Sequence, residues 1–157
     1  MPNSDPTDIP TRIALVHEWF SPRSVGGAEQ VVQAIDELLF SIGSRPDLAA
    51  LVDGESPLAG SWLSSRAIQT SFIQHLPGGV NHVQKYLPLL PFAVEQLDLS
   101  EYPLVISSSH LVAKGVLTSP EQFHLSYVHT PVRYAWDQMN TYLSRSTLAR
   151  IGFSPFI

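Results

Sequence analysis

The chain has 157 residues, of which 44% are hydrophobic and 15% are charged. This is enough for one domain with a hydrophobic core, and the composition excludes a disordered protein. The formal net charge of -5 argues against nucleic-acid binding, which needs a basic face. The absence of cysteine excludes disulfides and thiolate zinc sites.

The first 11 residues lack the basic and apolar regions of a signal peptide, and no apolar run has the length of a membrane span. We therefore expect residues 1–11 to be a flexible leader and residues 12–157 to form one cytoplasmic domain. The sequence leaves open whether this domain also binds peripherally to the inner face of the cell membrane.

The first recognisable unit is a short strand followed by a glycine loop and a helix. Residues 13–16 form an apolar run that is typical of a strand buried on both faces. We expect residues 17–19 to end this strand, Gly26 and Gly27 to form a loop, and an amphipathic helix to begin at Ala28. Such a unit opens a doubly wound, mainly parallel α/β domain of the Rossmann-like kind. Ligands of these domains bind outside the carboxyl ends of the strands.

The glycine pair has a chemical use at this position. Glycine lets the backbone approach a ligand closely, and the N-terminus of the helix offers free N–H groups to a phosphate or carboxylate. Neither the dinucleotide-binding pattern nor the P-loop pattern is present, so a tight turn without a ligand is an equal alternative. We expect Glu29, in the first helical turn, to have a structural role.

The remaining elements follow from apolar runs and their breaks. We expect Gly43 to end the first helix. Further strands are predicted at 48–52, 66–72, 103–107 and 123–128, and helices or turns at 80–87, 92–97, 112–117 and 132–142. The segment LPLLPF is predicted to pack mainly in the core, with a lipid- or partner-binding patch as the alternative.

Three histidines directly follow, or nearly follow, predicted strands. His17, His110 and His129 would lie on the same edge if the strands are parallel, and we expect them to form a functional cleft. The alternative for any one of them is a structural role at a strand end. The polar residues close to them in the sequence are Ser109, Thr130 and Arg133.

Two kinds of chemistry are disfavoured at these histidines. Three imidazoles can bind zinc, but the chain has no H-E-x-x-H pattern and no carboxylate beside His110 or His129 in the sequence. A serine hydrolase is disfavoured because no G-x-S-x-G motif exists. We therefore expect no metal and no cofactor.

Five motifs occur in order: RIALVHEW, GGAEQVV, YLPLLPFAVEQLDL, LVISSSHLVAKGV and YVHTPVRYAWD. Together they resemble the N-terminal domain of bacterial family 4 glycosyltransferases, particularly the mannosyltransferase-like members that make cell-surface polysaccharide. The resemblance runs from about residue 12 to residue 137. It implies one half of the GT-B arrangement, in which two Rossmann-like domains face each other across a cleft. The N-terminal domain mostly takes the acceptor, and these enzymes retain anomeric configuration without a metal.

The resemblance also implies roles for single residues. Gly26 and Gly27 match the loop that approaches the donor diphosphate or the reacting sugar. His129 matches a histidine that contacts the transferred sugar, which makes it the candidate catalytic residue. His110 and the serines before it, Ser109 included, match a strand end that faces the acceptor. We add His17, Thr130 and Arg133 as candidate substrate-binding residues.

The function that the resemblance implies is transfer of a hexose such as mannose from a nucleotide sugar to a cell-surface glycan or a lipid-linked acceptor. The motifs end before the donor-binding C-terminal domain of the family, so we expect an incomplete GT-B half that is inactive alone. The competing hypothesis is a half-domain that binds a ligand or partner and catalyses nothing.

Overall fold

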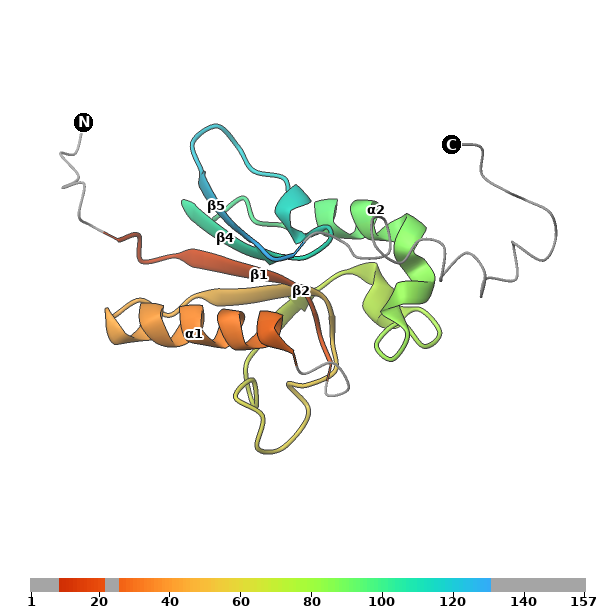
Figure 1. Ribbon diagram of the computed structural model, residues 1–157. Helices are drawn as coiled ribbons and strands as arrows, with labels where there is room; N and C mark the ends of the chain where they lie inside the picture. The colour runs from red at the N-terminus through yellow and green to blue at the C-terminus, as the bar shows by residue number, and fades with distance from the viewer. Residues whose placement is uncertain (1–8, 22–25, 131–157) are drawn as a thin grey trace.

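The computed structural model describes residues 9–21 and 26–130, and all structural statements below concern these residues. Its centre is a five-stranded, all-parallel sheet in the order β3-β2-β1-β4-β5 (Figure 1). The strands are β1 (Ile13–Phe20), β2 (Asp47–Asp53), β3 (Ile68–Thr70), β4 (Leu104–Ser109) and β5 (Phe123–Val128). With helices on both faces, this is a Rossmann-like α/β fold, as predicted.

The helices form two layers around the sheet. The helices are α1 (Gly27–Ser41), α2 (Leu90–Glu95) and the 3-10 helices η1 (Phe72–His75), η2 (Val83–Leu89) and η3 (Ala113–Gly115). One hydrophobic core lies between α1 and the sheet, around Leu15 and Val32. A second core lies on the opposite face, where Leu90 and Val94 of α2 pack against strand residues such as Val16 (Figure 1). Both faces of the central strands are therefore covered, which explains the apolar runs with which β1 and β4 begin.

The central strand β1 is longer than the sequence indicated. All eight of its residues are buried, including His17 and Glu18. The expectation that residues 17–19 end the strand is wrong, because the strand continues to Phe20. A carboxylate can occupy a buried strand only when donors surround it, and Glu18 has such donors, as described below.

Most other strand and helix boundaries lie close to the predicted ones. The prediction of a strand at 123–128 is confirmed, and α1 begins one residue earlier than expected. Gly43 ends α1 with a φ of +85°, a left-handed conformation that suits glycine. The predicted strand at 66–72 is reduced to the three residues of β3.

The predicted helices after β3 form shorter pieces. Residues 83–89 adopt a 3-10 helix, and α2 begins at Leu90 with Pro91 in its first turn, where a missing N–H costs little. The core prediction for LPLLPF is right for Leu90, which is fully buried, but Leu89 and Phe92 are 39% and 67% exposed. Among the described residues, no helix is long and apolar enough to cross a membrane.

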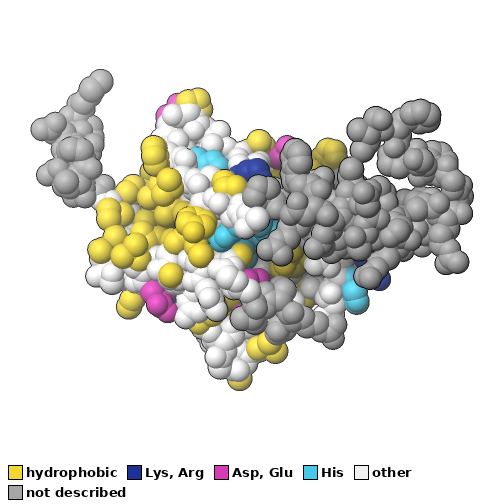
Figure 2. Space-filling view, viewed as in Figure 1, with side chains coloured by type: hydrophobic (Ala, Val, Ile, Leu, Met, Phe, Trp, Pro, Cys, Tyr) yellow, Lys and Arg dark blue, Asp and Glu magenta, His cyan; other side chains and the backbone are white. Residues whose placement is uncertain are grey.

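The last described strand, β5, has one apolar row that stays exposed. Phe123 and Leu125 are 66% and 52% exposed, and Leu38 of α1 is 62% exposed. Hydrophobic side chains gather on the face of the molecule that lies between these two elements (Figure 2). The predicted helix at 132–142 and residues 1–8 of the predicted leader lie outside the described residues.

Candidate functional site

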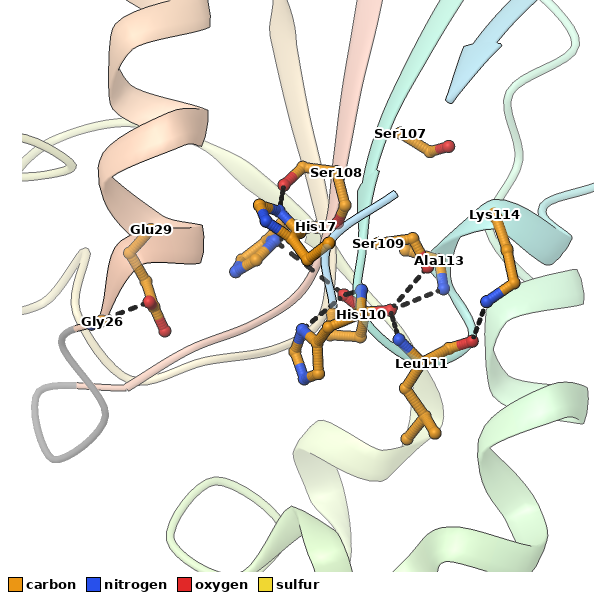
Figure 3. A network of polar contacts seen from close by, with 12 residues as sticks. His17, Gly26, Glu29, Ser107, Ser108, Ser109, His110, Leu111, Ala113 and Lys114 are labelled. Carbon is orange, nitrogen blue, oxygen red and sulfur yellow. Dashed lines mark hydrogen bonds and ion pairs between the residues drawn. The ribbon is translucent and has the colours of Figure 1, made fainter. Parts of the chain in front are cut away.

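The three strand-end histidines come together at the carboxyl edge of the sheet. Ser108, in β4, connects two of them (Figure 3): its carbonyl oxygen lies 3.1 Å from Nδ1 of His17, and its hydroxyl lies 2.7 Å from Nε2 of His129. The rings of His17 and His110 have centroids 6.2 Å apart. The parallel register, which pairs His17 with Ser108, delivers these groups to one place from three different strands.

A buried carboxylate, Glu18, organises the turn that carries His110. Its Oε1 accepts hydrogen bonds from the N–H groups of Leu111 and Ala113, at 2.8 and 2.9 Å, and from the Ser109 hydroxyl at 2.9 Å. Its Oε2 accepts the N–H of His110 at 3.3 Å and lies 3.1 Å from Nδ1 of the same residue. The chain after β4 therefore folds around one carboxylate, as Figure 3 shows.

The surroundings of Glu18 keep it ionised. Burial alone would raise its pKa, but the neighbouring imidazole of His110 and the N–H groups of Ala113 and Leu111 outweigh burial and hold the pKa at about 2. No carboxylate stands beside His110 in the sequence, but the fold brings Glu18 to it from β1. Sequence reasoning missed this contact, although Glu18, an acid two residues after an apolar strand run, needs several donors if the strand is buried.

His17 lies beneath the surface of the site. It is 1% exposed, and burial lowers its pKa, an effect partly opposed by the charge of Glu18, so the imidazole is neutral. Because its Nδ1 faces a carbonyl oxygen, that nitrogen carries the proton and donates to Ser108. Nε2 is then a buried acceptor with no hydrogen-bond partner among the described residues.

An open pocket of about 570 Å³ lies at this edge. The first turn of α1, the turn after β4 and the end of β5 form its walls. The residues that line it are Gly27, Ala28, His110, Tyr127, Val128, His129 and Thr130. The ring of Tyr127 packs on His129 with centroids 5.0 Å apart. Burial, together with the charge of His110, lowers the pKa of His129, which favours a neutral imidazole here as well.

Six of the eight predicted site residues divide into two groups. Gly27, His110, His129 and Thr130 line the pocket. His17 and Ser109 lie within the protein below it, where Ser109 donates its hydroxyl to Glu18. The substrate-binding and catalytic roles of all these residues stay predictions.

Gly26, the first residue of the glycine pair, already has a partner. Its N–H donates to Oε2 of Glu29 at 2.9 Å, so Glu29 caps α1 and has the structural role expected of it (Figure 3). Gly27 stays accessible, and a Cβ placed on it would meet no atom within 4 Å. Of the pair, Gly27 is therefore the residue placed to face a ligand. Arg133 lies outside the described residues.

Within residues 9–21 and 26–130, no group of three or more histidine, aspartate or glutamate side chains is placed to hold a metal ion. No known family model, curated protein or solved structure matches the chain significantly. The features of this chain that bear on function are therefore its motifs and the geometry of the carboxyl edge.

Proposed function

We propose that this chain is the acceptor-side domain of a retaining GT-B glycosyltransferase. It would act in the transfer of a hexose such as mannose from a nucleotide sugar to a cell-surface glycan or a lipid-linked acceptor. The observation that carries the proposal is the pocket in which His110, His129 and the first turn of α1 meet at the carboxyl edge of a parallel sheet. This is where Rossmann-like sheets bind ligands, and the residues in it belong to the motifs that resemble the family.

The first turn of α1 supports a role towards the donor diphosphate. Transfer of a hexose leaves negative charge on the departing diphosphate and develops positive charge on the sugar ring. The N-terminus of a helix stabilises negative charge through its free N–H groups and its dipole. Gly27, with no side chain, leaves room for a phosphate oxygen to approach the backbone.

His129 is suited to orient the transferred sugar. The Ser108 hydroxyl, 2.7 Å from Nε2, fixes the ring, and the Tyr127 ring packs against it. A neutral imidazole held in this way can bond a sugar hydroxyl through Nδ1, as donor or acceptor according to its tautomer. Fixed orientation of the reacting groups is one of the larger sources of rate in such reactions.

His110 is suited to the acceptor. Glu18 lies 3.1 Å from its Nδ1, and the ring edge of His110 meets Trp19 at a centroid distance of 4.8 Å. These two contacts fix the imidazole and leave Nε2 to bond an acceptor hydroxyl. A carboxylate that orients a histidine through Nδ1 is a common arrangement in enzymes that move protons from hydroxyl groups.

The test is an assay of the complete gene product with a panel of nucleotide sugars that includes GDP-mannose, UDP-glucose and UDP-galactose, together with lipid-linked glycan acceptors. We expect one donor to give a product heavier by one hexose, with the anomeric configuration of the donor retained and with no loss of rate after chelation of metals. Binding of a nucleotide sugar without transfer to any acceptor would instead favour the non-catalytic half-domain.

A further inference from the structure

The pocket of about 570 Å³ that His110 and His129 line is called the histidine pocket below. A second pocket, of about 490 Å³, shares no residue with it. It lies between α1 and the long connection from β2 to β3, which runs beneath α1 in Figure 1. The side chains that matter for its chemistry are Glu29, Gln30 and Gln33 of α1 and Glu55, Ser61 and Trp62 of the connection. Its volume lies within the range of roughly 300–1,000 Å³ that is usual for small-molecule sites.

The described lining of this pocket disfavours an anionic ligand. None of the described residues that line it is basic, and Glu29 and Glu55 are acidic. A phosphate or a nucleotide would meet repulsion from the Glu55 carboxylate, and no described lining residue supplies a cation to bind it. The side-chain amide of Gln30 offers both donors and an acceptor, a combination that matches hydroxyl groups. The amide of Gln33 donates one hydrogen bond to Glu37 at 2.8 Å and keeps its second N–H and its oxygen.

Glu55 is a buried acceptor with hydrogen-bonding capacity to spare. It is 9% exposed, and among the described residues its carboxylate accepts one hydrogen bond, a long one of 3.3 Å from the Ser61 hydroxyl. A tight turn fixes its position, because the Asp53 carboxylate accepts the N–H groups of Glu55 and Ser56 at 3.0 and 2.9 Å. Burial raises the pKa of Glu55. A buried carboxyl with unused lone pairs is suited to accept a hydrogen bond from a ligand.

Trp62 supplies a flat apolar wall beside these polar groups. Its ring stands nearly perpendicular to the ring of Phe20 in β1, with centroids 6.1 Å apart and an interplanar angle of 84°. Part of the indole is buried in the core under α1, so the ring is held in place before any ligand arrives. An indole face next to amides and a carboxylate matches a molecule with one C–H face and a rim of hydroxyl groups.

We infer that this second pocket binds an uncharged sugar ring, a neutral hexose unit. Its C–H face would pack on Trp62, and its hydroxyl groups would bond Glu55, Gln30 and Gln33. This site does not depend on the proposed transferase function, since it would serve a non-catalytic carbohydrate-binding module equally well.

The experiment is a titration of the 15N-labelled 157-residue chain with three neutral probes: methyl α-mannoside, methyl α-glucoside and methyl β-galactoside. Spectra report the Trp62 indole N–H and the side-chain amides of Gln30 and Gln33. We expect saturable shifts of these signals with at least one neutral glycoside. Glucose 6-phosphate, at a matched concentration, should leave them nearly unchanged, and glucosamine tests whether the carboxylates bind an ammonium group instead of the ring hydroxyl groups.

Variants locate the binding. Glu55→Gln, which keeps the shape of the side chain, should weaken binding of the active glycoside by at least about tenfold, the effect expected for losing a hydrogen bond to a charged group. Gln30→Ala changes an exposed helix residue and should weaken binding without affecting the fold. Gln84→Ala, an exposed glutamine outside both pockets, is the matched control and should bind as the parent does.

Three results would overturn the inference. The first is the absence of saturable shifts with all three neutral glycosides. The second is binding of only the amine or only the phosphate probe. The third is neutral-glycoside binding that neither Glu55→Gln nor Gln30→Ala weakens while the spectra show both variants to be folded.

Discussion

Glu18 in β1 and Ala113 at the start of η3 are 95 residues apart, and the Ala113 N–H donates to the Glu18 carboxylate at 2.9 Å. This bond, with those from Leu111 and Ser109, fixes the turn after β4 to the central strand. The turn carries His110 into the histidine pocket. The shape of the pocket therefore depends on a carboxylate that does not line it.

Replacing Glu18 by glutamine should be strongly destabilising. The amide oxygen can replace only one of the two carboxylate oxygens, so the new NH2 group, a donor, would face either the His110 N–H or the donors that now bond Oε1. We expect Glu18→Gln to lower the free energy of unfolding by roughly 3–5 kcal/mol, as for other broken buried pairs. Glu101→Gln is the control, because the Arg12–Glu101 pair lies on the surface with its side chains 50% and 70% exposed. Urea unfolding that gave equal losses for the two variants would contradict this role of Glu18.

The histidines should make the fold sensitive to acid. Burial is the first cause of the lowered pKa values of His17, His124 and His129, so the folded state favours their neutral forms. The unfolded chain takes up protons near the ordinary pKa of 6.5, so their contribution to stability is complete above that pH. It is lost progressively as the pH falls from 6.5 towards the folded pKa values, with a slope of up to about 1.4 kcal/mol per pH unit for each group.

A variant of His17 tests this pH dependence. His17→Asn keeps an N–H group where Nδ1 donates to Ser108 but does not titrate. Urea unfolding between pH 5 and pH 8 should therefore give a flatter stability curve for this variant than for the parent. His82→Asn makes the same substitution at an exposed histidine and is the control for the change itself. Identical slopes for all three proteins would show that His17 is not buried in its neutral form.

Gly27→Val should separate ligand binding from folding. A Cβ at Gly27 meets nothing within 4 Å, so the fold should tolerate valine, but the side chain would enter the histidine pocket. We expect use of the sugar donor by the complete gene product to fall about tenfold or more, a loss of about 1.4 kcal/mol in binding. Ala34→Val places the same side chain at an exposed position of the same helix, outside the pocket, and should leave kinetics normal. Equal kinetics for the two variants would remove Gly27 from the site.

The leucines near α2 should differ in their effect on stability. Leu90 is fully buried, so Leu90→Ala should cost roughly 2–5 kcal/mol. Leu89 is 39% exposed, and Leu89→Ala should cost less than about 1 kcal/mol. Thermal unfolding measures both effects. Liposome binding that falls with Leu89→Ala would favour a lipid-facing role for the exposed part of this segment, whereas similar destabilisation by both variants would contradict the observed packing.

Local sequence patterns predicted much of the fold, because in this chain they report burial directly. A short apolar run such as residues 48–52, bounded by turn residues, has few alternatives to a strand, and all five of these residues are buried. Gly43 ends α1 because its left-handed φ suits glycine. The alignment of His110 and His129 followed from parallel strands alone, since their carboxyl ends meet at one edge.

The parts that could not be predicted depend on contacts between distant residues. The pairing of Glu18 with the turn around Ala113 requires the β1–β4 register, which no local pattern contains. For the same reason β1 was expected to end before its polar residues. The second pocket needs Trp62 placed against Phe20, and the shape of the connection between β2 and β3 decides that contact.

The most direct test of the histidine site compares two histidines near β5. His129 lines the pocket with Nε2 2.7 Å from the Ser108 hydroxyl, while His124, inside β5, has Nε2 2.9 Å from the Ser107 hydroxyl and lies outside that pocket. Turnover of the complete gene product should fall by one to several powers of ten in His129→Ala, at about 1.4 kcal/mol per tenfold, and should stay nearly intact in His124→Ala. The melting temperature of His129→Ala should change little. Equally mild effects of the two substitutions on turnover would contradict the assignment and leave His129 as a structural residue at the end of a strand.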